Sequence, residues 1–217
     1  MSPPVWSLPS RGRPASIARL AEAYTRTGAM CRVHVRLDQD DPALPAYLAL
    51  ELPEGWTVQL GPRIGCQPCF NEPMELWPEA EGYGILGDDA LPLTDNWDRI
   101  LAEAAGLDKI AYAADLLAGE AQVTYGIVGG DLARSIGFIA LPGLIRLCSD
   151  TVLTLIGKRR GVLCYRPDVV IEHMHFSNGK APFDETYAKP EGAADKALYD
   201  RWLEVYEATG DEWGGTR

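Results

Sequence analysis

The sequence feature that most constrains the fold is the alternation of short apolar runs with amphipathic segments of helical length. Apolar, β-branched and aromatic runs predict strands at residues 4–8, 31–37, 56–60 and 83–86. Between the first two runs, a helix is predicted to begin at Pro14, because apolar residues then recur at helical spacing: Ile17, Leu20, Ala21 and Tyr24. Strands that alternate with helices favour an α/β protein whose mostly parallel central sheet lies between helical layers.

The second half of the chain continues this pattern. Apolar runs predict strands at 109–115, 122–128, 161–165 and 168–176, and helical spacing predicts helices at 97–105, 151–159 and near 194–207. A short irregular helix is expected around 70–77, where Pro73 interrupts the pattern. We therefore expect one domain over residues 1–180 and a C-terminal extension, 181–217, whose single helix packs on that domain.

Composition indicates a cytoplasmic protein. No apolar run is long enough to span a bilayer, and the N-terminus lacks the apolar core of a signal peptide, so no membrane partner is expected. The five cysteines are odd in number and scattered, which is a poor disulfide framework. Cys66 and Cys69 form a CxxC, but no second pair stands at zinc-ligand spacing, and structural thiols are expected.

Charge is unevenly distributed along the chain. A net charge of −11 argues against a broad nucleic-acid-binding face. Residues 1–36, however, contain six arginines and one acidic residue, and a second basic patch lies at 157–161. Arg11 and Arg13 are expected to meet a small anion, and the remaining arginines are expected to be solvated surface.

Three polar clusters fall where predicted strands end. They comprise residues 10–13, residues 38–41, and the adjacent Asp88 and Asp89. Ligands of parallel α/β sheets bind beyond the carboxyl ends of the strands. The three clusters therefore predict one binding site at a single edge of the sheet.

Two kinds of metal ligand lie among these candidates. Adjacent carboxylates such as Asp88 and Asp89 repel each other, and a hard divalent cation relieves the repulsion, although the same residues also form an ordinary turn. His173 and His175 are two apart on a predicted strand and so point to the same face. Their imidazoles shift the expected metal from Mg²⁺ towards Mn²⁺.

Four motifs in this order carry a resemblance to a known family: "PSRGRP", "RLDQDDP", "GILGDDALP" and a late "EHMH". Together they resemble GT-A nucleotide-sugar glycosyltransferases, closest in character to the small family-two-like enzymes of bacteria and phages. The resemblance covers residues 4–176. It implies a three-layer, Rossmann-like GT-A fold and the metal-dependent transfer of a sugar from a nucleoside diphosphate sugar, most often a UDP-sugar, to a hydroxyl acceptor.

The resemblance also implies roles for individual residues. Asp38 would accept a hydrogen bond from the base, Asp88 would face the ribose, and Asp89 would bind Mn²⁺ or Mg²⁺. His175, or in second place His173, would complete the metal shell. Gly87 stands where the family motif has its first aspartate. The nucleotide pocket would be lined by Pro9, Ser10, Arg11 and Arg13, with Arg11 or Arg13 near the pyrophosphate.

A glycosyltransferase that inverts configuration also needs a carboxylate to accept the proton of the acceptor hydroxyl. Asp150 is the first candidate, with a helix N-cap as the alternative role. Asp131 is the second candidate, with a turn as the alternative. Trp97 and Tyr125 could stack on an acceptor, although core packing is the role preferred for both.

Several functional alternatives stay open on the sequence. The acceptor could be a hydroxymethylated pyrimidine in phage DNA, which the local basic patches favour and the overall acidity opposes. A phage-encoded protein would act in the host cytoplasm. A nucleotidyltransferase acting on sugar phosphates would also use paired aspartates and a metal, but it normally has a more glycine-rich loop after the first strand. The third reading is a non-catalytic nucleotide-binding module. The chain could be a monomer or a homodimer.

Overall fold

The computed structural model describes residues 2–183 and 192–215. Its centre is one eight-stranded sheet with the strand order β3-β2-β1-β4-β7-β6-β8-β5. The strands are β1 (Val5–Ser10), β2 (Arg32–Asp38), β3 (Trp56–Gly61), β4 (Gly82–Ile85), β5 (Ala90–Pro92), β6 (Ile110–Ala114), β7 (Gly126–Gly129) and β8 (Leu163–His173).

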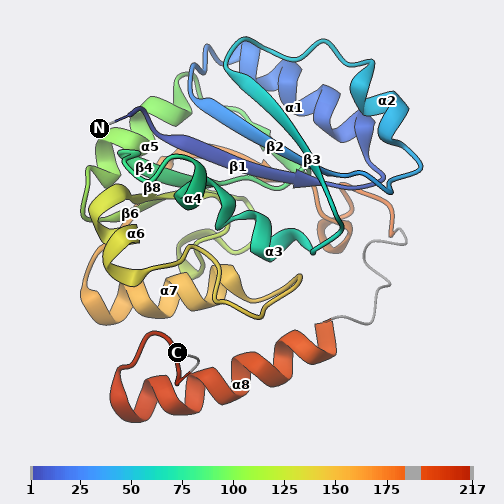
Figure 1. Cartoon of the computed structure of the whole chain (residues 1–217). Coiled ribbons are helices and arrows are strands. Elements are labelled where there is room, and N and C mark those ends of the chain that lie inside the picture. Colours follow the sequence, from blue (N-terminus) through green and yellow to red (C-terminus); the bar gives the residue numbers. More distant parts are fainter. Residues whose placement is uncertain (1, 184–191, 216–217) are drawn as a thin grey trace.

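Helices cover both faces of this sheet (Figure 1), with α1 and α2 on one side and α7 and α8 on the other. They are α1 (Pro14–Arg26), α2 (Leu44–Leu48), α3 (Cys66–Cys69), α4 (Glu72–Leu76), α5 (Trp97–Ala105), α6 (Gly130–Ile136), α7 (Ser149–Arg160) and α8 (Gly192–Thr209), with the short 3₁₀ turns η1 (Gly119–Ala121) and η2 (Phe176–Asn178). The predicted three-layer α/β class is confirmed. Part of the expected C-terminal extension, residues 184–191, lies outside the described residues.

Strand direction determines which loops meet at each edge of the sheet. β1 pairs in parallel with β2 and β4, and β2 with β3. β7 runs antiparallel to both β4 and β6, whereas β8 runs parallel to β6. The carboxyl ends of β1, β2, β4, β6 and β8 therefore share one edge with the amino end of β7.

The later strands differ from the sequence-based expectation. The two strands predicted at 161–165 and 168–176 are one continuous strand, β8, whose register against β6 shifts between Ala113 and Ala114. That irregularity coincides with Pro167, which lies between Arg166 and Val170, the residues that pair with β6 on either side of the shift. The strand expected over 122–128 is shorter, at Gly126–Gly129, and the three-residue β5 and the helix α6 were not predicted.

Two apolar clusters form the core. One contains Trp6, which meets Trp97 edge to face at 4.8 Å between ring centroids. The other contains Tyr83, Phe138 and, from α8, Trp202. Val5 belongs to the second cluster and Trp6 to the first, as expected where successive side chains of a strand face opposite ways.

Helix α8 packs against α7 through apolar and polar contacts. Trp202 and Tyr206 are buried in the second cluster, Arg159 Nη1 donates to the Tyr206 carbonyl at 2.7 Å, and Tyr206 Oη donates to the Leu155 carbonyl at 3.2 Å. Among the described helices, none is both long enough and apolar enough to cross a membrane.

Candidate functional site

A cavity of about 660 Å³ opens at the edge of the sheet where most of the strands have their carboxyl ends. Every site residue predicted from the sequence lines it except Asp131; those that do are Pro9, Ser10, Arg11, Arg13, Asp38, Asp88, Asp89, Asp150, His173 and His175. The parallel arrangement of β1, β2 and β4 brings the three polar clusters together, as expected from the sequence.

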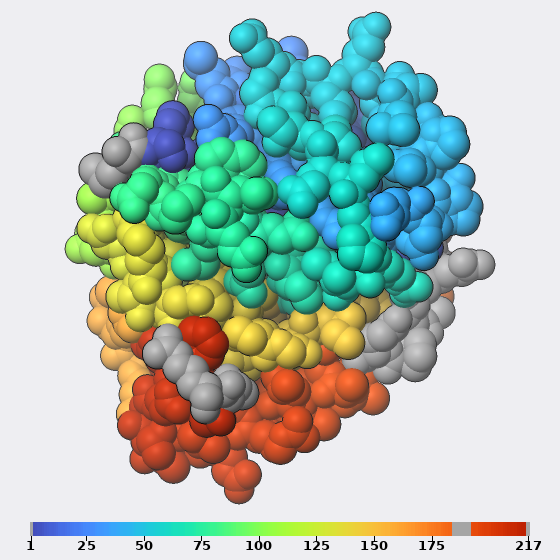
Figure 2. Space-filling view, viewed as in Figure 1, coloured from blue at the N-terminus to red at the C-terminus, as the bar shows by residue number. Residues whose placement is uncertain are grey.

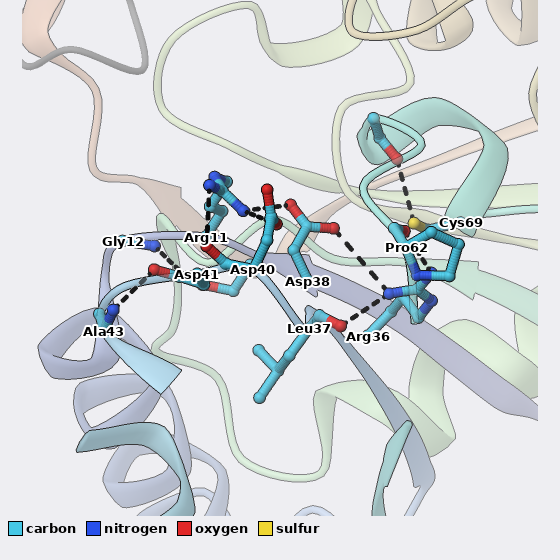
Figure 3. A network of polar contacts seen from close by, with 12 residues as sticks. Arg11, Gly12, Arg36, Leu37, Asp38, Asp40, Asp41, Ala43, Pro62 and Cys69 are labelled. Carbon is cyan, nitrogen blue, oxygen red and sulfur yellow. Dashed lines mark hydrogen bonds and ion pairs between the residues drawn. The ribbon is translucent and has the colours of Figure 1, made fainter. Parts of the chain in front are cut away.

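One wall of the cavity is built from the loops that follow β1 and β2 (Figure 3). Arg11 Nη1 bridges two carboxylates, at 3.0 Å from Asp38 Oδ2 and 2.6 Å from Asp40 Oδ1. These two carboxylates raise the pKa of Arg11 against the opposing effect of burial. The guanidinium thus lies charged at the cavity, beside the predicted base-binding Asp38.

The same wall has an internal frame that the sequence did not reveal. Asp41 accepts from the Gly12 amide at 2.7 Å and from the Ala43 amide at 2.8 Å. Buried Tyr47, on α2, meets Ser10 Oγ at 2.7 Å and accepts from the Arg13 amide at 2.7 Å. Both side chains are hydrogen-bonded within the protein, so they hold the loop after β1 in place.

Arg36 corrects an expectation about the arginines. It is 3% exposed rather than solvated, and its guanidinium donates to Glu72 Oε1 at 3.0 Å and to the Leu37 and Pro62 carbonyls at 2.7 and 2.9 Å. A buried guanidinium needs this degree of hydrogen bonding. Arg36 therefore ties the end of β2, next to Asp38, to Glu72 and to the Pro62 carbonyl.

Asp88 contacts two residues at the carboxyl end of β1: Ser10, the last residue of the strand, and Arg13 in the loop that follows. Ser10 Oγ donates to its Oδ2 at 2.7 Å, and Arg13 Nη1 lies 3.1 Å from its Oδ1. Burial, with the adjacent Asp89 charge, nevertheless raises the pKa of Asp88 to about 6. Near neutral pH this carboxylate is ionised at an energetic cost, which a cation beside it would reduce.

Asp89 has a different environment. Its Oδ1 accepts from Tyr125 Oη at 2.8 Å, and its Oδ2 lies 3.3 Å from His173 Nε2. Burial opposes ionisation, but His173, Tyr125 and the Arg13 charge together outweigh it, and the pKa of Asp89 is lowered. A Cβ atom at Gly87 would overlap Asp89 Oδ1, so a side chain at this position would displace the Asp89 carboxylate from its present contacts.

The two histidines contact different residues. His173, the last residue of β8, meets Asp89, whereas His175 accepts from the Ser177 amide at 3.2 Å through its Nδ1. The centroids of the two imidazole rings are 4.9 Å apart, so the rings lie side by side as expected. The structure thus places His173 against Asp89, although His175 was the first choice from the sequence.

The residues present fit a divalent cation that shares its shell with a substrate. Across residues 2–183 and 192–215, no three His, Cys, Asp or Glu side chains are grouped so as to hold a metal ion on their own. Asp89 Oδ2 and His173 Nε2, at 3.3 Å, are close to the spacing of about 3 Å between adjacent ligands of an octahedral ion with bonds of about 2.1 Å. Mg²⁺-type ions commonly take the remaining ligands from water and phosphate.

Asp150 lies on another wall of the cavity, in the first turn of α7. The N-cap of this helix is Cys148, so the alternative role of Asp150 as N-cap is not what the structure shows. Its Oδ2 accepts from Gln122 Nε2, and its Oδ1 from the Thr151 amide at 2.8 Å. Burial raises the pKa of Asp150, which is the direction that makes a carboxylate a better proton acceptor.

The structure does not bring Asp131 to this site. Asp131 is exposed on α6, where its Oδ1 pairs with Arg134 Nη2 at 2.7 Å. Trp97 is core, as preferred from its sequence context, whereas Tyr125 is buried but also contacts Asp89. No spacing pattern pointed to the roles of Tyr125 or Gln122 in the site.

The cysteines of the described residues are free thiols. Cys66 lines the cavity, but burial raises its pKa to about 11, and burial raises that of Cys69 to about 12. Thiols with such pKa values are poor nucleophiles and poor metal ligands at neutral pH. These properties agree with a structural role for the CxxC.

Comparison with known proteins gives similarity at the level of fold. No protein family model and no curated protein matches the sequence. A mannosyltransferase from Pyrobaculum calidifontis, in complex with GDP-Man and Mn²⁺, is similar with a TM-score of 0.58 at 14% identity, over 95% of this chain and 75% of that one.

Two further solved structures are similar over nearly their whole length. A protein from Bacillus anthracis described as a glucose-1-phosphate thymidylyltransferase, in complex with a sucrose, has a TM-score of 0.55 at 8% identity, over 86% of this chain and 99% of that one. A Mycobacterium tuberculosis H37Rv protein in complex with manganese has a TM-score of 0.51 at 14% identity, over 81% and 94%. At these identities the likeness establishes the fold alone.

Proposed function

We propose that this protein is a metal-dependent glycosyltransferase that transfers a sugar from a nucleoside diphosphate sugar, with a UDP-sugar as the donor, to a hydroxyl acceptor. The observation that carries the proposal is the shared cavity. It combines a carboxylate–imidazole pair, Asp89 and His173, with arginines on one wall and a separate, half-buried carboxylate, Asp150, on another. The mannosyltransferase complex with GDP-Man and Mn²⁺, which shares the fold, supports this choice of chemistry.

The donor would lie along the loops after β1 and β2. Asp38 would accept from the base, while Arg11 and Arg13 would face the diphosphate. Both arginines are held by carboxylates, Arg11 by Asp38 and Asp40 and Arg13 by Asp88, so they are oriented before the donor binds. Preorganised positive charge of this kind stabilises the charge that develops on a leaving diphosphate.

Asp89 and His173 would hold Mn²⁺ or Mg²⁺, with Asp88 beside them facing the ribose. When bound, this cation would supply the Lewis acidity that neutralises the departing diphosphate. The lowered pKa of Asp89 keeps the carboxylate ionised for this purpose. Tyr125 fixes the direction of the carboxylate through its hydroxyl.

Asp150 would act on the acceptor. In an inverting transfer, the bond between the sugar and the diphosphate breaks, a bond from the acceptor oxygen to the same carbon forms, and the hydroxyl proton passes to Asp150. Gln122 and the Thr151 amide orient the carboxylate. Asp131, outside the cavity, has no part in this step.

Nucleotide binding tests the proposed metal site directly. Calorimetry should show that UDP binds in the presence of Mn²⁺ and much more weakly without it. Asp89→Ala should reduce this affinity by at least about 100-fold, because loss of outer-shell partners alone costs 10- to 100-fold. Asp131→Asn is the matched control and should bind as the unchanged protein does; equal binding by both variants would contradict the proposal.

Turnover tests the reaction class. The protein is incubated with Mn²⁺, a panel of nucleotide sugars and a panel of acceptors that includes simple methyl glycosides and DNA containing hydroxymethylated pyrimidines. Release of the nucleoside diphosphate together with a product heavier by one sugar is expected. No mass gain on DNA with any donor removes the DNA acceptor, and metal-dependent UDP binding without turnover of any donor favours a non-catalytic nucleotide-binding module.

A nucleotidyltransferase acting on sugar phosphates is the second candidate. It is favoured by the fold shared with the protein described as a thymidylyltransferase, of which this chain covers 99%. It is opposed by the loop after β1, which contains a single glycine, Gly12. Formation of a nucleotide sugar and pyrophosphate from a sugar 1-phosphate and a nucleoside triphosphate would establish this reaction in place of sugar transfer.

A further inference from the structure

The C-terminal helix carries a buried carboxylate that is aimed at the cavity wall. Asp195, on α8, is 1% exposed. Its Oδ1 accepts from the Ile145 amide at 2.8 Å, and its Oδ2 accepts from the Arg146 and Leu147 amides at 2.7 and 2.8 Å. Three consecutive backbone donors thus converge on one side chain.

The backbone held in this way, residues 145–147, is named here the wall loop, because all three of its side chains line the cavity. Figure 2 shows α8 packed against the part of the chain that precedes α7. Asp195 itself is not among the residues that line the cavity. Its effect on a bound substrate must therefore pass through the wall loop.

Gln67 holds the wall loop from its other side. The Gln67 amide donates to the Ile145 carbonyl at 3.1 Å, and Gln67 Nε2 donates to the Arg146 carbonyl at 2.7 Å. The carbonyl side of the loop is therefore tied to the segment around α3, and its amide side to α8. Loss of the Asp195 bonds would therefore leave the loop held only on its carbonyl side.

The wall loop leads directly into the residue that would accept the proton. Leu147 is followed by Cys148 in the left-handed conformation (φ 79°), then by Ser149, and then by Asp150. A left-handed backbone is uncommon for a residue with a side chain and persists where the surroundings hold it. Small movements of the wall loop would thus move the start of α7 and the Asp150 carboxylate with it.

We propose that Asp195 is a positioning residue: from the C-terminal helix, it fixes the wall loop and through it the acceptor half of the cavity, including Asp150. The inference rests on the proposed glycosyl transfer for its functional meaning. The donor half would be built by the loops after β1 and β2, whereas the three backbone hydrogen bonds of Asp195 go to the wall loop. Loss of the Asp195 carboxylate should therefore affect the acceptor side and spare nucleotide binding.

The test compares Asp195→Asn with Asp200→Asn, an exposed aspartate on the same helix whose carboxylate pairs with Lys196. An asparagine amide cannot accept all three backbone bonds. In Asp195→Asn, the amides of residues 145–147 should exchange hydrogen at least tenfold faster, and the ¹³C NMR titration midpoint of the Asp150 carboxyl should move by more than half a pH unit. The Mn²⁺-dependent affinity for UDP should stay within twofold.

Activity then adds a kinetic readout. With a donor and a methyl glycoside acceptor from the panel above, the acceptor KM should rise at least tenfold in Asp195→Asn, with a smaller change in kcat and no change in the donor KM. Asp200→Asn should match the unchanged protein in every measurement. Asp195→Glu keeps the carboxylate, so its acceptor KM should lie between the values of Asp195→Asn and the unchanged protein. It replaces Asp195→Asn in the test if that variant does not fold.

The outcomes separate the two proposals. An unchanged Asp150 titration in Asp195→Asn, or faster amide exchange without a change in acceptor KM, overturns the positioning role. Absence of turnover in the unchanged protein with every donor overturns the proposed transfer, and the exchange and titration measurements still decide whether Asp195 positions Asp150.

Discussion

At the residue scale, two adjacent carboxylates of identical chemistry have different titration behaviour. Asp88 is desolvated and lies beside another negative charge, so its pKa is raised to about 6. Asp89 is partly buried, which opposes its ionisation, but His173 and Tyr125 stabilise its ionised form and its pKa is lowered. The proposed roles differ accordingly: Asp89 would bind a cation directly, and Asp88 would lie close enough for the cation to reduce the cost of its ionisation.

This difference predicts a pH-dependent stability effect of Asp88→Asn in metal-free protein. The folded pKa of Asp88, about 6, lies above its ordinary value of 3.8, so between these values the folded state binds more protons than the unfolded state. The contribution of Asp88 to the free energy of unfolding then falls as the pH rises through this window, by up to about 3 kcal/mol. The stability of Asp88→Asn relative to the unchanged protein should rise by a similar amount from pH 4 to pH 7.

Urea unfolding at half-unit pH intervals measures this difference. The exposed Asp131→Asn serves as the control and should show a difference that is nearly constant with pH. A constant difference for Asp88→Asn as well would mean that Arg13 and Ser10 stabilise the ionised form enough to cancel the desolvation.

At the element scale, close packing of β4 on β1 explains one glycine of the sheet. A Cβ atom at Gly84 would overlap the indole ring of Trp6, which is fully buried and packed against Trp97. Gly84→Ala should therefore reduce the free energy of unfolding by about 1–3 kcal/mol, the usual cost of overpacking a core. Chemical denaturation measures the change.

A double-mutant cycle with Trp6→Phe tests the cause. The smaller ring leaves more room, so Gly84→Ala should cost less in the Trp6→Phe background than in the unchanged protein. Equal costs in both backgrounds would show that the contact with Trp6 is not responsible.

The elements predicted from the sequence were those whose pattern is local. The strand at 31–37 and the helix at 97–105 were predicted to within a residue of β2 and α5, because alternation or helical spacing is complete within each segment. Strand β5, with only three residues, has no detectable period, and it exists because it pairs with the end of β8. The two strands expected at 161–165 and 168–176 form one strand, because β8 pairs with β6 on both sides of Pro167, up to Arg166 and again at Val170.

At the scale of the whole molecule, the C-terminal helix belongs to the same core as the sheet. Trp202 is 1% exposed in the cluster that also contains Phe138 and Tyr83. Trp202→Ala should therefore lower the free energy of unfolding by about 3–5 kcal/mol, as for other buried tryptophans. Unfolding followed by far-UV circular dichroism should remain a single transition with a lower midpoint.

Leu203→Ala on the same helix is a matched control, because Leu203 is only partly buried against that cluster and should cost less. Two separate transitions in either variant would indicate that α8 unfolds independently of the sheet. That result would also weaken the role given to Asp195, which requires α8 to be held firmly.

The sequence by itself determined where the site lies. Polar residues after the first, second and fourth strands were expected to meet, because the carboxyl ends of parallel strands share one edge, and the cavity is lined by Ser10, Asp38 and Asp88 as expected. The exception, Asp131, follows β7, which runs antiparallel and therefore ends at the opposite edge of the sheet. The same reversal brings Tyr125, just before β7, to the site, where an all-parallel sheet would have placed it far away.

Only the tertiary structure decided which side chains contact one another. His173 rather than His175 faces Asp89, Gln122 meets Asp150, and Asp195 reaches the wall loop 48 to 50 residues earlier in the chain. The physical reason is that local periodicity specifies an element and its buried face, whereas strand direction, register and helix packing depend on contacts between distant segments. Residue types and strand ends could therefore be read along the chain, but their partners could not.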